Sequence, residues 1–166
     1  MELVFFLKLN KYSSFKKCLN CGQGTNTRGE LLALWCLLYF AITNNISHLH
    51  ILGDSKIVVD WFKHNVDLRV ASLQRWTQRI HIMENNFSFI SMKHIYRNYN
   101  TMADTLSKDA LTLEEGKMVV MDMVDNNQHH LEILNNFLLL FLMVWLVVDY
   151  LVRLYSTRHV SFGQFY

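Results

Sequence analysis

Three carboxylates stand where one expected secondary-structure element gives way to another. Glu30 begins a long apolar run, Asp54 follows the short apolar run LHILG, and Asp104 lies in the first turn of the last expected helix. Clustered carboxylates repel one another unless a cation holds them, and hard oxygen ligands suit Mg²⁺ or Mn²⁺. If the fold brings these side chains together, the chemistry expected of them is the binding of such a divalent cation.

Each of these carboxylates also has a purely structural explanation. Thr27 and Glu30 match the T-x-x-E capping box at the N-terminus of a helix. Asp54 can serve as a turn residue, and Asp104 can stabilise the start of a helix through the helix dipole. Residue type and position alone leave the structural and the chemical explanations open.

The hydrophobic pattern predicts the elements that would position these residues. Strands that alternate with helices predict an α/β fold, and sites in such folds gather at the carboxyl ends of strands. Asp54 lies at one such end and His94 lies near another, where an imidazole can move protons near neutral pH. The other seven histidines show no ligand spacing. The expected strands are 3–9, 12–19, 48–53 and 87–95, and the expected helices are 29–43, 56–64, 70–87 and 100–111.

Three segments of the chain resemble the ribonuclease H type-1 domain, and they are most similar to its plant reverse-transcriptase-like branch, which is associated with retroelements. The segments are TNTRGELLALWCLL, LHILGDSKIVVDW and KHIYRNYNTMADTLSKDAL, and they occur in the family's order. The similarity covers about residues 5–113. It implies a mixed sheet flanked by helices and metal-dependent hydrolysis of the RNA strand of RNA–DNA hybrids.

The resemblance also implies roles for individual residues. Glu30, Asp54 and Asp104 match three of the family's four catalytic, metal-binding carboxylates. His94 lies ten residues before Asp104 and matches the family's loop histidine, and Asn100 fits the family pattern too. The cofactor implied is Mg²⁺, or Mn²⁺ in its place.

One element of the family pattern is missing. The family opens with a strand that bears an Asp-Gly pair, whereas VFFLKLN here resembles the second strand and SSFKKCLNCG the third. The only acid before Glu30 is Glu2, in a different element. We therefore expect the first strand to be missing and the chain to be truncated at its N-terminus. A catalytically impaired, binding-only remnant is the alternative to an active ribonuclease.

Contacts to nucleic acid are expected from polar residues around these motifs. Amides can reach base edges or the 2′-hydroxyl that distinguishes RNA from DNA, and cationic side chains can meet phosphates. The expected contact residues are Asn26, Lys56, Arg97 and Asn100. Trp61 and Trp76 are expected in the core. The net charge of +2 does not by itself indicate a nucleic-acid partner.

Cysteine usage and the absence of a secretory signal favour an intracellular protein with reduced thiols. The three cysteines are Cys18, Cys21 and Cys36. Cys18 and Cys21 form a C-x-x-C pair, but a zinc finger needs a second ligand pair, and strand-end cysteines are the favoured interpretation. The sequence indicates neither an oligomeric state nor a natural substrate.

The last third of the chain is expected to lie outside the ribonuclease H-like domain of residues 1–113. Residues 114–166 are expected to form an irregular segment with a hydrophobic C-terminal helix from about Phe137. The run FLLLFLMVWLVV at 137–148 is shorter than the roughly 20 residues that a membrane span needs. A membrane anchor therefore stays the alternative, and we expect a chain that ends near Leu113 to fold equally well.

Overall fold

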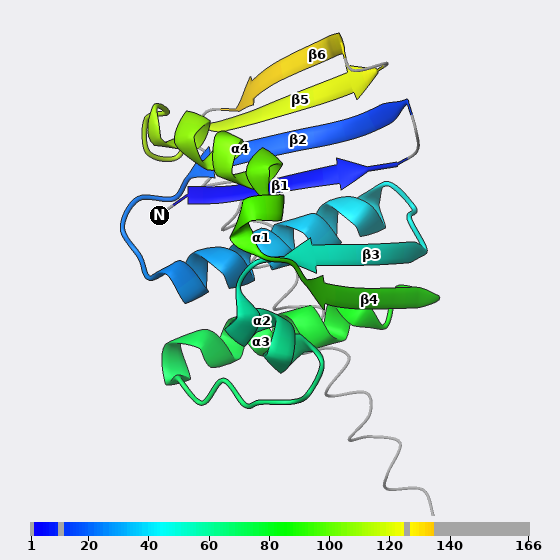
Figure 1. Cartoon of the computed structure of the whole chain (residues 1–166), viewed down its shortest axis with the longest axis vertical. Coiled ribbons are helices and arrows are strands. Elements are labelled where there is room, and N and C mark those ends of the chain that lie inside the picture. Colours follow the sequence, from blue (N-terminus) through cyan, green and yellow to red (C-terminus); the bar gives the residue numbers. More distant parts are fainter. Residues whose placement is uncertain (1, 10–11, 125–126, 135–166) are drawn as a thin grey trace, which may run out of the picture.

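The computed structural model describes residues 2–9, 12–124 and 127–134, and their strands form two sheets (Figure 1). In the first, β1 (Glu2–Lys8) pairs with β2 (Ser13–Asn20), β2 with β5 (Met118–Val124), and β5 with β6 (Asn127–Leu134), all antiparallel. In the second, β3 (His48–Gly53) and β4 (Phe89–His94) are parallel. The helices are α1 (Asn26–Thr43), α2 (Lys56–Phe62), α3 (Ala71–Glu84) and α4 (Thr101–Leu111), with a 3₁₀ turn η1 (Arg97–Tyr99) before α4. The expected α/β class is confirmed.

The apolar helix α1 is the centre of the core. It contacts β1 and α3, which leaves few of its side chains in solvent, and Leu31, Leu38 and Ala41 are fully buried. A helix that is apolar on nearly every side needs partners on several sides, and these elements supply them. The aromatic side chain of Phe40 packs against Phe5 of β1, with ring centroids 6.0 Å apart.

The structure places the start of α1 earlier than the expected residue 29. The Thr25 hydroxyl accepts a hydrogen bond from the backbone N–H of Arg28, so Thr25 caps the helix and Glu30 lies in its second turn. The capping-box explanation of Glu30 with Thr27 is therefore wrong. The Glu30 side chain does not belong to the cap of α1.

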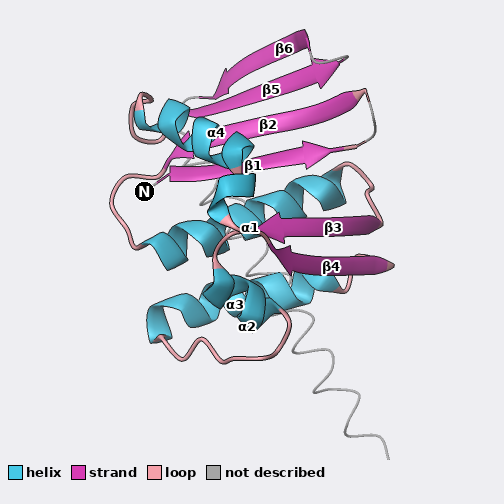
Figure 2. Cartoon of the chain, in the orientation of Figure 1, coloured by secondary structure: helices cyan, strands magenta, loops and turns pink. Residues whose placement is uncertain are grey.

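Helices contact the four-stranded sheet at β1 and β2, where α4 crosses the two strands in Figure 2. Cys18 and Leu19 are neighbours on β2 and are both buried, although adjacent strand residues point to opposite faces. Leu19 belongs to the core with α1. Cys18 lies on the other side, where burial and then the negative charge of Asp109 on α4 raise the pKa of its thiol. The β1–β2 part of the sheet therefore lies between α1 and α4.

Residues 118–124 and 127–134 correct the expectation of an irregular segment after Leu113. They form β5 and β6, and β5 pairs along nearly the whole of β2, from Leu19 with Met118 to Ser13 with Val124. The Met118 side chain is 5% exposed and belongs to the core. The physical reason is the unpaired edge that β2 would otherwise present, because a Val- and Met-rich segment satisfies that edge. A chain that ends near Leu113 would lose these strands, so we no longer expect it to fold equally well, and the position of the domain boundary stays a prediction.

The hydrophobic run at 137–148 lies outside the described residues, and so do the expected tail helix and the membrane-anchor alternative. Within residues 2–9, 12–124 and 127–134, no helix has the length and the apolar character that a membrane crossing requires.

Candidate active site

The two parallel strands β3 and β4 end side by side, and this brings two of the predicted residues together. Gly53 is in register with His94, and the backbone N–H of Ile95 donates to the carbonyl of Gly53 at 2.9 Å. The Nε2 of His94 lies 3.2 Å from the carbonyl oxygen of Asp54. A carbonyl oxygen only accepts, so Nε2 carries the proton in this contact and Nδ1 of a neutral ring is left as the acceptor.

Glu30 reaches the same place from α1. Burial, and after it the negative charge of Asp54, raise the pKa of its carboxyl from 4.5 to about 7, and the positive charge of Arg97 opposes both. Glu30, Asp54 and Arg97 come from α1, from the end of β3 and from η1, yet they lie within electrostatic reach of one another. The structure thus brings together two of the three predicted carboxylates and one predicted cation.

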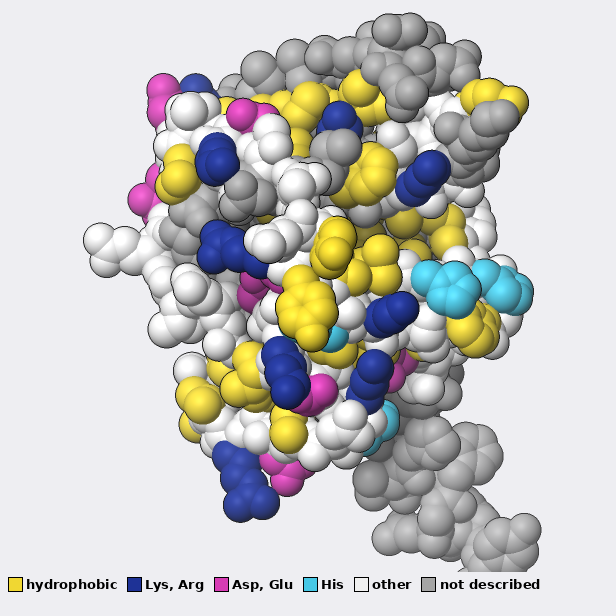
Figure 3. Space-filling model, viewed as in Figure 1, with side chains coloured by type: hydrophobic (Ala, Val, Ile, Leu, Met, Phe, Trp, Pro, Cys, Tyr) yellow, Lys and Arg dark blue, Asp and Glu magenta, His cyan; other side chains and the backbone are white. Residues whose placement is uncertain are grey.

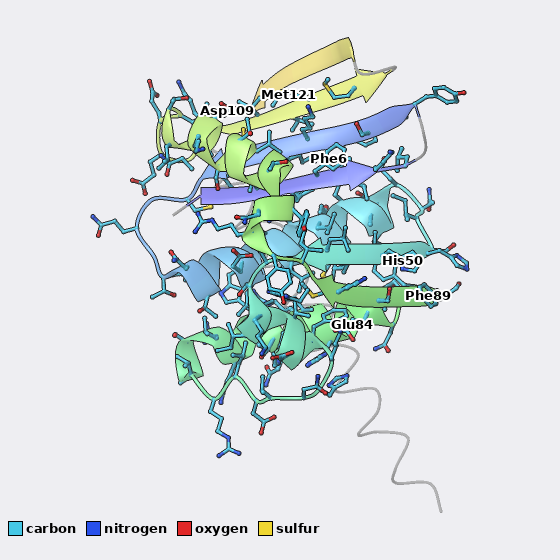
Figure 4. The ribbon with its side chains drawn as sticks, viewed as in Figure 1. Phe6, His50, Glu84, Phe89, Asp109 and Met121 are labelled. Atoms are coloured by element: carbon cyan, nitrogen blue, oxygen red, sulfur yellow. The ribbon has the colours of Figure 1, made fainter. Side chains whose placement is uncertain are left out.

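A cavity of about 790 Å³ joins these residues. One part of it lies between β1 and β3, which are not paired with each other in the part of the chain that the structure describes. Figure 4 labels Phe6 on β1 and His50 on β3, which are on the two strands that flank this part. The candidate site residues that line the cavity are Asn26, Glu30, Asp54, Arg97 and Asn100.

The backbone places Asp104 on α4, three residues inside the helix start, and its side chain lies outside what the structure describes. Asn100 and Ser107 both line the cavity. Residues three and four apart share a face of a helix, so position 104 lies on the face of α4 that carries Asn100 and Ser107. The helix therefore supports the expected position of the third carboxylate, while its contact with the other two stays a prediction.

The predicted nucleic-acid contact residues are exposed, except for Asn100. Lys56 is the first residue of α2 and is not part of the cavity lining. Asn26 and Arg97 are exposed at the cavity, and Asn100 is partly buried there. Figure 3 shows Lys and Arg side chains interspersed with acidic ones over the face shown, rather than gathered into one basic patch.

Two aromatic residues beside the site were missed by the sequence patterns. Tyr96 and Tyr99 are 73% and 79% exposed, and Tyr99 lines the cavity. The Tyr96 ring lies edge-on to His94, with centroids 5.6 Å apart. The segment IYRNYN, with two tyrosines in a short polar loop, is the signal that could have identified them. Trp61 and Trp76, in contrast, are buried as expected.

The comparisons with known proteins agree with this geometry. A family model described as reverse transcriptase-like matches residues 12–110. The structure is similar to ribonuclease H1 from the halophilic archaeon Halobacterium salinarum, at 21% identity and a TM-score of 0.54, over 66% of this chain and 95% of that one. It is similarly close to the N-terminal ribonuclease H domain of a Mycobacterium tuberculosis protein, at 20% identity and a TM-score of 0.54, over 66% and 92% of the two chains.

A third similar structure is the LC11 ribonuclease H1 in complex with an RNA/DNA hybrid, at 14% identity and a TM-score of 0.53, over 66% of this chain and 96% of that one. No curated protein matches this chain in sequence. The family model and the structures confirm both the resemblance stated from the motifs and the ribonuclease H-like fold.

Proposed function

The chain belongs to the reverse-transcriptase-like family, and from that premise we propose that it binds RNA–DNA hybrids through a ribonuclease H-type site that uses Mg²⁺ or Mn²⁺. The observation that carries this proposal is the convergence of Glu30 and Asp54, from separate elements, on one cavity. The RNA/DNA hybrid held by the LC11 enzyme supports the class of partner.

The donor atoms fit a hard divalent cation. Glu30 and Asp54 offer only oxygen ligands, and they lie close enough for the charge of one to raise the pKa of the other. A divalent cation bound between them would offset both that repulsion and the burial of Glu30. Glu30, Asp54 and Asp104 are the residues we propose to hold it. Such a cation, when bound, supplies activated water and stabilises the leaving oxygen of a phosphodiester.

His94 is proposed to move protons at the edge of this site. Its Nε2–H donates to the Asp54 carbonyl, which fixes the ring orientation beside the carboxylates. The free Nδ1 is then the atom that accepts a proton and returns it. Because the contact is to the backbone of Asp54, it survives substitution of the Asp54 side chain.

The cavity lining supplies the proposed contacts to the hybrid. Arg97 can meet a phosphate, and Asn26 and Asn100 can reach base edges or a 2′-hydroxyl. Lys56 can meet a phosphate from the start of α2. The exposed rings of Tyr96 and Tyr99 offer surfaces on which a base or sugar can stack.

We propose further that the site lacks the family's fourth carboxylate and cleaves poorly for that reason. Glu2 in β1 is the only acid that precedes Glu30 in the sequence. Two divalent cations bring four positive charges, which three carboxylates do not balance. The cavity between β1 and β3 supports this proposal, because a strand added there would pair with both and run to the carboxyl end of β3.

The test is a cleavage and binding assay with a labelled RNA–DNA hybrid in Mg²⁺ or Mn²⁺. We compare the chain with its Asp54→Asn variant and with a chain extended at its N-terminus by an Asp-bearing strand. We expect weak, salt-sensitive binding by all three and robust cleavage only by the extended chain. Robust cleavage by the unextended chain that Asp54→Asn abolishes would refute the fourth-carboxylate proposal, and hybrid binding no tighter than duplex DNA binding would refute the proposed partner.

A proposal about the origin of the chain rests only on the three motif segments. We propose that it derives from the plant, retroelement-associated branch, because the three motif segments are most similar to that branch.

A further inference from the structure

A second group of metal-ligating side chains lies on α3 and on the turn that follows α2. The ligand atoms of His64, His81 and Glu84 all lie within 4.8 Å of one another. The Nδ1 of His81 is 3.0 Å from Oε1 of Glu84, and the rings of His64 and His81 are stacked with their centroids 5.2 Å apart. None of the three lines the cavity of the carboxylate site. We propose that this group, the His64 cluster, binds Zn²⁺.

The backbone at His64 gives independent support. The N–H of His64 donates to the Trp61 carbonyl and the N–H of Asn65 to the Asp60 carbonyl, which is the Schellman pattern that closes a helix. His64 occupies the left-handed position of this motif, with φ of 59°. Glycine is usual there because a side chain is strained in that conformation. The strained position is nevertheless occupied by His64, and its imidazole stacks on the ring of His81.

The ligand set selects zinc over magnesium. Two imidazoles and one carboxylate, with a fourth position open to water, are a common zinc set, whereas Mg²⁺ prefers oxygen ligands alone. Zinc–nitrogen bonds of about 2.0–2.1 Å place tetrahedral ligand atoms roughly 3.3 Å apart. The ligand atoms of His81 and Glu84 are already close to that spacing, at 3.0 Å. The side chain of His64 is exposed, and it would have to move closer to both of them to bind the same ion.

The proposed ion would link α3 to the segment that follows α2. His64 lies in the segment 63–70 between α2 and α3, and His81 and Glu84 lie one turn apart near the end of α3. The His81 ring also packs against Trp61 of α2, with centroids 4.8 Å apart. Zinc at the His64 cluster would therefore fasten the end of α2 to α3, and it would replace the direct contact between His81 and Glu84.

The experiment measures thermal unfolding of the full chain with and without Zn²⁺, and visible absorption with Co²⁺ as a spectroscopic substitute. The variants are His64→Asn, which keeps a residue tolerated in the left-handed position, and Glu84→Gln. His48→Asn and Glu115→Gln are matched controls, because both residues are exposed and lie outside the cluster. We expect Zn²⁺ to raise the unfolding temperature of the parent chain and of both controls, and Mg²⁺ not to reproduce the effect.

In His64→Asn and Glu84→Gln, zinc affinity should fall by more than the roughly 10–100-fold that loss of a supporting partner costs. Binding that survives both substitutions unchanged would assign the zinc to other ligands, such as the cysteines, and overturn the proposal. No zinc binding by the parent chain would overturn it too. Neither result bears on hybrid binding, because the His64 cluster and the carboxylate site share no residue.

A third variant separates zinc binding from simple packing. His64→Gly relieves the left-handed strain, so it should raise the unfolding temperature without metal and abolish the further rise that Zn²⁺ gives. A loss of stability without metal would mean that His64 is retained for its contacts in the metal-free protein, and that would contradict the role proposed here.

Discussion

Substitution of Glu30 by Gln should stabilise the metal-free protein at alkaline pH. Burial and the charge of Asp54 raise the pKa of the Glu30 carboxyl to about 7 in the folded chain, against 4.5 as its ordinary value. Below about pH 4.5 the group is protonated in both the folded and the unfolded states and has no effect on their balance. Between the two values only the folded state holds the proton, so stability falls as the pH rises through this window.

The magnitude follows from the same two values. A difference of about 2.5 pH units, at about 1.4 kcal/mol each, corresponds to about 3 kcal/mol of stability lost by pH 8. Gln has nearly the same shape and never ionises. Glu30→Gln should therefore be more stable than the parent chain by about 1–3 kcal/mol at pH 8, and the two should be alike at pH 4.

The assay is urea unfolding of both proteins in chelator between pH 4 and pH 8, with Glu115→Gln as the control for loss of an exposed carboxylate. A saturating concentration of Mg²⁺ at pH 8 should recover much of the lost stability in the parent chain and little in Glu30→Gln. Parallel pH profiles for the parent chain and Glu30→Gln would refute the conclusion that Glu30 lies beside Asp54 in a partly buried site.

Three further changes test the fold and the site. A chain that ends at Leu134 should keep cooperative unfolding, whereas one that ends at Leu113 loses β5, leaves the edge of β2 open and forfeits about 1.5–3 kcal/mol from Met118 alone, as measured by urea unfolding. Leu38→Ala, in the fully buried centre of α1, should cost about 2–5 kcal/mol in the same experiment, while a value under 1 kcal/mol would place Leu38 outside the core. Arg97→Gln should raise the pKa of Glu30 further, seen as a pH profile moved to higher pH, and should lower the salt dependence of hybrid binding by about one phosphate contact.

The helices and the strands β1 to β4 were predictable because their apolar patterns are clear. The expected strand 48–53 and helix 56–64 agree with β3 and α2 to within two residues, and Asp54 lies at the expected strand end. The start of α1 was misplaced because Thr25 and Thr27 both resemble caps, and only the backbone decides between them. Strands β5 and β6 were missed because β5 is stabilised by pairing with β2, which is distant in the sequence, and β6 is stabilised by pairing with β5.

The candidate site was found through motif resemblance rather than from spacing. No periodic pattern relates Glu30 to Asp54, and their proximity depends on where the fold places the first turns of α1 relative to the end of β3. The His64 cluster was missed for a related reason. His64 is 17 residues before His81 in the sequence, and a left-handed residue after α2 is what turns its side chain back toward α3.

The division into two sheets also sets the order in which the chain can fold. Pairing of β2 with β5 joins Cys18 to Val119, which are 101 residues apart, so the four-stranded sheet closes only after most of the chain has been synthesised. The β1–β2 hairpin pairs locally, and β3 and β4 are separated only by α2 and α3. Because contacts of long sequence separation form slowly, closure of β5 onto β2 should limit the folding rate, and the hairpin edge stays open to intermolecular pairing until then.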